Sequence, residues 1–190
     1  MLATRMIDLD GTTQANGHAL APPHSIEAEQ SVLGAILLSD RTLYALVIEE
    51  GLKADDFYRR RHQLVYESML ALYGESEPID VLTVTEHLRS RGAIEEAGGQ
   101  SAVDSLAASV PAAGNARHYA RIVREHSLMR RLLTATYEIQ SSVAENAGDA
   151  RELVERAERA MLDVAHDDRQ KDFRSIEEVL DTEIDKMHRL

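Results

Sequence analysis

Apolar residues recur every three or four positions along most of this chain, which is the period of an α-helix. Polar cap residues, or a helix-ending Gly or Pro, separate one apolar stripe from the next. Residues 1–21 show no such period, so we predict a disordered arm there. The pattern then predicts five short helices, at about 26–38, 40–50, 60–73, 80–91 and 101–109.

The fourth of these segments also fits a second structure. Residues 81–85 are rich in β-branched side chains, which favour strands. Asp80 in front of them is a good helix cap, and the polar continuation to Arg91 has helical spacing. We therefore predict a helix rather than a strand.

The helices predicted after residue 114 are longer. Asn115 is placed to cap a helix that meets no Gly or Pro before Gly148. Asp149 then opens a second long helix, with Glu152 at its third position as in a capping box. Two long helices joined by so tight a turn form an αα-hairpin.

A polar, aperiodic segment follows, and then a final amphipathic helix. Ser175 and Glu178 form a capping box at its start. The predicted fold class is all-α: a compact helical globule followed by a long αα-hairpin and a linker helix. The predicted divisions are a disordered arm at 1–21, the globule at 22–113, the hairpin at 114–167, a flexible linker at 168–173 and the linker helix at 174–190.

Both hairpin helices carry apolar faces wider than a single helix–helix contact covers. Either the globule covers the remaining surface or a second copy of the chain does, and the pattern leaves both open. The candidate self-association residues are Leu132, Leu133, Ile139, Val143, Leu153, Val154, Met161 and Val164.

The final helix has little of its own chain left to pack against. It either folds back on the helical bundle or docks on another subunit or a domain outside this chain. The candidate docking residues share one face of that helix and are Ile176, Val179, Leu180, Ile184 and Met187.

Composition narrows the functional classes. The 190 residues include 33 acidic and 21 Lys or Arg residues, which gives a net charge of −12 and argues against tight binding to a phosphate backbone. The chain has no cysteine, which excludes disulfides and thiolate metal sites. No apolar run approaches the roughly 18–20 residues of a membrane span, so we expect a cytoplasmic protein without a membrane partner.

Motifs for catalysis are missing. None of the ten glycines is followed by Lys, so a phosphate-binding loop is absent, and no histidines have metal-ligand spacing. Adjacent carboxylates do not face one another on a helix, so we predict solvated surface and helix ends for these pairs. They are Glu49-Glu50, Asp55-Asp56, Glu95-Glu96 and Asp167-Asp168. We expect no catalytic, cofactor or metal site in this chain, and no enzyme activity of its own.

Two basic clusters interrupt the acidic background. One is Arg59-Arg60-Arg61-His62, and the other begins with a helical stripe at Arg117, Arg121 and Arg124 and continues to Arg130-Arg131. Nearby acids favour ion pairing within or between subunits, and contact with nucleic acid is the alternative.

Six segments, in order, resemble the amino-terminal part of the replicative DNA helicase of bacteria, the DnaB family. They are Pro22-Pro23-His24-Ser25 with the following twelve residues, 56–58, 77–80, 98–99, 109–111, and Asn115 with 119–125. His24-Ser25 replaces the Gln-Asn that is common in the family. The resemblance extends over residues 22–190.

The resemblance implies a helical domain, a hairpin and a linker helix ahead of a RecA-like motor. Since the motor motifs are absent, we expect the sequence to stop within the linker helix. It also implies that hairpins pair into dimers, that three dimers form a hexameric ring, and that the ring binds primase and a helicase loader. The linker helix would pack on the neighbouring motor, and ATP and Mg would serve the intact helicase. The alternatives are a free-standing helical adaptor and a nucleic-acid-binding module.

Overall fold

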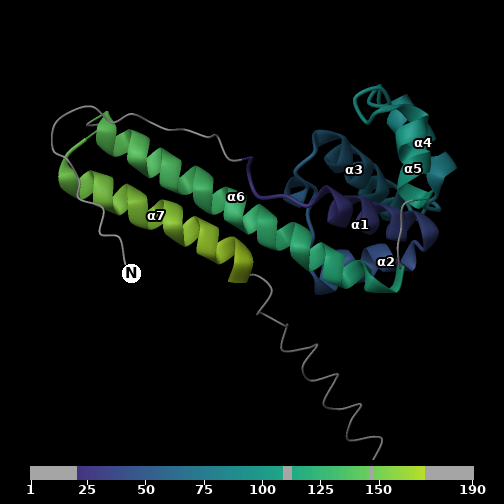
Figure 1. Ribbon diagram of the computed structural model, residues 1–190, viewed down its shortest axis with the longest axis horizontal. Coiled ribbons are helices and arrows are strands. Elements are labelled where there is room, and N and C mark those ends of the chain that lie inside the picture. Colours follow the sequence, from purple (N-terminus) through teal and green to yellow (C-terminus); the bar gives the residue numbers. More distant parts are fainter. Residues whose placement is uncertain (1–20, 109–112, 146–147, 170–190) are drawn as a thin grey trace, which may run out of the picture.

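The computed structural model describes residues 21–108, 113–145 and 148–169, and every regular element in these ranges is helical (Figure 1). The all-α prediction is therefore confirmed. The predicted arm and linker helix, with Ile176, Val179, Leu180, Ile184 and Met187, lie outside the described residues. The elements are α1 (Ile26–Leu38), α2 (Arg41–Tyr44), the π-helical turn η1 (Ala45–Glu49), the 3₁₀ turn η2 (Ala54–Asp56), α3 (Arg60–Gly74), α4 (Val81–Ser90), α5 (Gly99–Ala108), the 3₁₀ turn η3 (Ala113–Asn115), α6 (Ala116–Ala144) and α7 (Ala150–Arg169).

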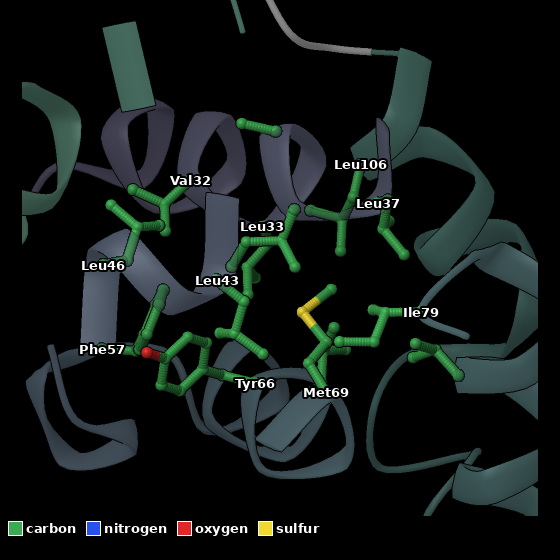
Figure 2. Packing of buried hydrophobic residues seen from close by; sticks show 14 of the residues in the cluster. Val32, Leu33, Leu37, Leu43, Leu46, Phe57, Tyr66, Met69, Ile79 and Leu106 are labelled. Carbon is green, nitrogen blue, oxygen red and sulfur yellow. The ribbon is translucent and has the colours of Figure 1, made fainter. Parts of the chain in front are cut away.

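Helix α1 is the centre of the globule. It contacts α2, α3, α5 and α6, and nine of its 13 residues are buried. This explains why its apolar stripe is so wide, since a helix covered on several sides is apolar on several sides. Leu33 of α1, Leu43 of α2 and Met69 of α3 meet in the core, with Phe57 and Tyr66 beside them (Figure 2).

The helix predicted over the β-branched run is confirmed as α4. Oδ1 of Asp80 accepts a hydrogen bond from the Thr83 amide at 2.9 Å, and Oγ1 of Thr83 accepts one from the Asp80 amide at 3.0 Å. This reciprocal cap satisfies two amides that would otherwise lack partners. Val84 and Leu88 of α4 are buried in the core, so packing and capping together outweigh the local strand preference.

Three local predictions need correction. The second predicted helix is not one α-helix, because α2 gives way to the π-helical turn η1 before Gly51, whose φ is +59°. Helix α5 begins at Gly99, two residues earlier than predicted. Asn115 makes no capping hydrogen bond with its side chain; it ends the turn η3, and α6 follows directly.

The hairpin projects from the globule (Figure 1). Helix α6 has 29 residues, a length of about 44 Å at 1.5 Å per residue. Its first part lies against α1 and its later part against α7. Oδ1 of Asp149 accepts from the amides of Arg151 at 2.8 Å and Glu152 at 2.9 Å, which confirms the predicted cap. Helix α7 continues to Arg169, two residues into the predicted flexible linker.

Candidate protein interaction site

The apolar residues of the hairpin fall into two groups. The first lies in the seam, the contact between α6 and α7. Ile139 and Leu153 line one small cavity there with Ala157 and Ala160, and Val164 lines a neighbouring opening. These seam side chains are half-buried, so they hold the two helices of one chain together. Three of the eight candidate self-association residues therefore have an intrachain role.

The second group points into solvent, each residue between 42% and 70% exposed. We call these seven the outer hairpin residues: Met129, Leu132, Leu133, Tyr137, Val143, Val154 and Leu162. Four of them were among the sequence candidates, and Met161, another candidate, is half-buried. Tyr137 was missed although it is four residues from Leu133 and hence on the same helix face, a spacing that could have revealed it.

The basic stripe at the start of α6 is engaged in ion pairs. Arg117 lies 2.6 Å from Glu49, and Arg121 bonds both carboxylate oxygens of Glu50 at 2.9 and 3.1 Å. The hydrogen bond to Glu50 and its negative charge raise the pKa of Arg121. The prediction of intramolecular ion pairing is confirmed for these two arginines. Glu50 is buried, so the prediction of solvated surface was wrong for that residue.

Further along α6, Arg130 joins three segments of the chain. Its guanidinium donates to the carbonyl oxygens of Pro23 at 2.8 Å and Asp56 at 2.6 Å. The same group lies 5.7 Å from the centre of the Tyr58 ring, and His24 stacks on that ring at 4.3 Å. Burial lowers the pKa of Arg130, and the charge of Glu29 opposes that shift. An arginine retains its charge despite such a shift.

The neighbouring Arg131 binds a buried carboxylate. Its Nη2 lies 3.0 Å from Oδ1 of Asp56, whose Oδ2 accepts from the Lys53 amide at 2.9 Å. Asp56 is buried, so here too the prediction of solvated surface was wrong. The reason is the turn η2, which directs Asp56 toward α6 and leaves Asp55 exposed.

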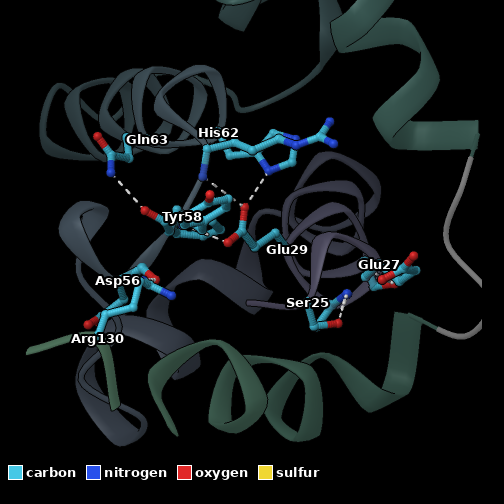
Figure 3. Close-up of polar contacts among 12 residues, drawn as sticks. Ser25, Glu27, Glu29, Asp56, Tyr58, His62, Gln63 and Arg130 are labelled. Carbon is cyan, nitrogen blue, oxygen red and sulfur yellow. Dashed lines mark hydrogen bonds and ion pairs between the residues drawn. The ribbon is translucent and has the colours of Figure 1, made fainter. Parts of the chain in front are cut away.

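Glu29 connects this junction to the core (Figure 3). Its Oε1 accepts from the Tyr58 amide at 2.6 Å, and Oε2 accepts from the Arg59 amide at 3.4 Å and contacts Nδ1 of His62 at 2.6 Å. Figure 3 also shows Gln63, which donates to the Phe57 carbonyl at 2.7 Å. Every carboxylate that is buried in the described residues therefore has a bonding role in the fold.

Within the described ranges, no three His, Asp or Glu side chains lie close enough to hold a metal ion. No helix in the same ranges is long and apolar enough to cross a lipid bilayer. Of the thirteen large apolar side chains that are exposed in the described residues, seven are the outer hairpin residues.

Known proteins similar to this chain share one family. The model for the DnaB-like helicase N-terminal domain matches residues 21–125. The chain is 39% identical over 169 residues to the replicative DNA helicase DnaC of Bacillus subtilis (strain 168), covering 89% of this chain and 37% of that protein. It is 38% identical over 181 residues to the replicative DNA helicase DnaB of Mycobacterium leprae, covering 94% and 30%. It thus spans about a third of these relatives' length.

Two solved structures of DnaB-type proteins have a fold similar to that of this chain. The N-terminal domain of DnaB helicase from Mycobacterium tuberculosis is 41% identical with a TM-score of 0.70, over 74% of this chain and 99% of that one. A DnaB-like replicative helicase, described with its interactions with primase, has a TM-score of 0.67 over 85% of this chain and 36% of that one. At 24% identity, this second likeness concerns the fold alone.

Proposed function

Because this chain belongs to the family of DnaB-like helicase N-terminal domains, we propose that it is the assembly module of a replicative DNA helicase. It pairs with a second copy through the hairpin, supports a hexameric ring built from three dimers, and recruits primase. The intact protein unwinds duplex DNA with ATP in the cytoplasm. The observation that carries this proposal is the set of outer hairpin residues on a hairpin that projects from the globule.

Exposed apolar side chains support pairing because water disfavours them. Seven large apolar side chains on two adjacent helices form more apolar surface than single scattered residues, and such surfaces mark association sites. A second copy is the commonest partner, since most soluble oligomers are built from identical chains with two-fold symmetry. The seam residues, by contrast, keep each hairpin intact before it pairs.

The proposed protein partners beyond a second copy are primase and a helicase loader. A DnaB-like replicative helicase of the same fold is described with its interactions with primase, and the first of these partners is proposed by analogy with that protein. Charge supports protein rather than DNA as the partner. The net charge is −12, and Arg117, Arg121 and Arg131 of α6 are bound to acids of the same chain.

We propose that ATP and Mg bind to a part of the intact helicase other than this chain. The sequence has no phosphate-binding loop, and the described residues bring no cluster of carboxylates together for a metal ion. We therefore place both ATP and Mg in the motor of the intact helicase. This chain then acts through protein contacts.

The test is the mass of the protein in solution, measured by light scattering on a size-exclusion column. Tyr137→Asp places a charge among the outer hairpin residues, and we expect it to convert a dimer or larger assembly into a monomer. Tyr73→Asp is the matched control, since Tyr73 is exposed on α3 of the globule. A charge at Leu153 would not test pairing between chains, because Leu153 lies in the seam between α6 and α7 of one chain. A monomeric wild type, or an assembled Tyr137→Asp, would contradict hairpin pairing.

The nucleic-acid alternative has its own test. Fluorescent single-stranded DNA is titrated with the protein at low salt and again at moderate salt. We expect weak binding at both, because a net charge of −12 opposes association with a phosphate backbone. Strong binding that weakens steeply with salt would favour the nucleic-acid-binding module instead.

A further inference from the structure

The attachment of the hairpin to the globule begins with small side chains. The buried positions in the first part of α6 are Ala116, Ala120, Val123 and Ser127, spaced three or four residues apart on one face. This part of α6 lies along α1. Small side chains allow two helices to approach closely but interlock little, and the larger Tyr119 and Ile122 beside them are only partly buried against the core. Such contacts permit packed helices to slide or roll by small amounts.

Polar attachments of α6 to the globule begin at the ion pairs of Arg117 with Glu49 and of Arg121 with Glu50, and they continue at Arg130. Arg130 lies one turn beyond Ser127, and its two guanidinium nitrogens donate to carbonyl oxygens of two separate segments, those of Pro23 and Asp56. Both acceptors are backbone atoms, so they cannot follow the guanidinium by changing a rotamer. Because the guanidinium is planar and two of its nitrogens are bound, these hydrogen bonds fix the orientation of α6 as well as its distance from the globule.

The ring of Tyr58 holds the same guanidinium from a third direction. His24 stacks on this ring with an angle of 15° between the two planes. The Tyr58 backbone is in turn bound by Glu29, which contacts His62 in the interior (Figure 3). A continuous series of short contacts therefore leads from buried residues of α1 and α3 to Arg130 on α6.

We propose that Arg130 is a positioning residue that sets the orientation of the hairpin relative to the globule. It acts through the carbonyl groups of Pro23 and Asp56 and the ring of Tyr58. Orientation matters for assembly because it decides the direction in which each globule projects from a pair of hairpins; this consequence rests on the proposed function. The orientation itself is a property of one chain and can be measured separately.

Electron spin resonance can measure this orientation, because the sequence has no cysteine to remove before labelling. Spin labels are attached at Ser101→Cys on α5 and Glu145→Cys at the end of α6, both exposed. Labelled protein is diluted with unlabelled protein, so that only distances within one chain contribute. In the parent protein we expect a single narrow distance distribution.

Arg130→Met keeps an unbranched side chain and removes every donor. We expect it to make the distance distribution about twofold broader or to shift its maximum, since the helix contact and the ion pairs of Arg117, Arg121 and Arg131 that remain hold the orientation less firmly. Arg130→Lys keeps the charge but not the fork, so we expect partial recovery. Arg159→Met is the matched control, because Arg159 is exposed and pairs with Glu155 of its own helix, α7; we expect the distribution to stay narrow.

A second variant covers the case in which Arg130→Met does not fold. Tyr58→Leu removes the ring beneath Arg130 from a partly exposed position and should broaden the same distribution. Hydrogen exchange in α1 and α3 reports whether the globule is intact. A merely stabilising role would lower the melting temperature and leave the distribution of the folded protein unchanged.

If Arg130→Met and Tyr58→Leu both lower the melting temperature but leave the distance distribution unchanged, the positioning role is overturned. A monomeric wild type with the expected broadening would contradict hairpin pairing and leave the role of Arg130 standing. If the wild type assembles but both variants keep the parent distance distribution, hairpin pairing stands and the positioning role of Arg130 is contradicted.

Discussion

Nδ1 of His62 lies 2.6 Å from Oε2 of Glu29, and each of these side chains is only 2% exposed. The same carboxylate accepts from the Tyr58 amide, so one buried group binds α3 and the segment that precedes it to α1. A buried carboxylate is costly unless its oxygens are satisfied, and here two backbone amides and a ring nitrogen satisfy them.

Removal of this carboxylate should therefore be strongly destabilising. Glu29→Ala leaves the Tyr58 amide and the His62 ring without their acceptor, and we expect a loss of about 3–5 kcal/mol in the free energy of unfolding. Glu29→Gln retains one acceptor oxygen and should lose less. Glu27→Ala, an exposed acid of the same helix turn, is the control and should lose less than about 1 kcal/mol. Urea denaturation measures all three, and equal losses for Glu27 and Glu29 would contradict the role of the buried group.

Tyr66 makes stability sensitive to alkaline pH. Its hydroxyl donates to the Leu52 carbonyl at 3.1 Å, and burial, followed by the charge of Asp56, raises its pKa well above the ordinary 10.0. The unfolded chain loses this proton near pH 10 while the folded chain keeps it. Stability from Tyr66 is thus complete below about pH 10 and falls above it, by up to about 1.4 kcal/mol per pH unit.

The measurement is urea denaturation at several values from about pH 8 to about pH 11. Tyr66→Phe should be less stable at neutral pH and should lack most of the alkaline decline. Tyr137→Phe removes an exposed tyrosine and should decline as the wild type does. An unchanged decline in Tyr66→Phe would assign the alkaline effect to other groups.

Replacement by alanine should change the stability of the folded protein in opposite directions at two glycines. Gly98 has a φ of +95°, and an added Cβ would lie 2.9 Å from Cβ of Ala102, so Gly98→Ala should destabilise by at least about 1 kcal/mol. Gly74 ends α3 and has open space around it. Gly74→Ala should stabilise by about 0.4–1 kcal/mol, because alanine reduces the entropy of the unfolded chain. Thermal melts of both variants test this, and the opposite order would refute it.

The cap of α7 should govern the stability of the hairpin more than that of the globule. Asp149→Ala removes the acceptor of two amides, and we expect a loss of about 1 kcal/mol. Hydrogen exchange should accelerate in the first turn of α7 and stay unchanged in α1. Asp104→Ala, an exposed position within α5, is the control. Faster exchange throughout the chain would show that the hairpin and the globule unfold as one unit.

The buried acids show where sequence reasoning reached its limit. Glu29 follows a helix cap, and its position by itself indicates a favourable charge near the helix start. Glu50 and Asp56 belong to adjacent acidic pairs of the kind that usually lie in water. Their partners, Arg121 and Arg131, are 71 and 75 residues away in sequence. No local pattern identifies a partner at that separation, since only the packing of α6 on the globule brings the groups together.

The positions of most helices, their type, the αα-hairpin and the family resemblance follow from the sequence alone. Apolar period, caps and glycines are local signals, and they act within a few residues. The tertiary structure decided which apolar residues meet across the seam and which face water, as Leu153 and Tyr137 illustrate. It also decided that the basic residues of α6 attach the hairpin to the globule. A helical period specifies that a face exists, but the element packed against that face is determined only when distant segments meet.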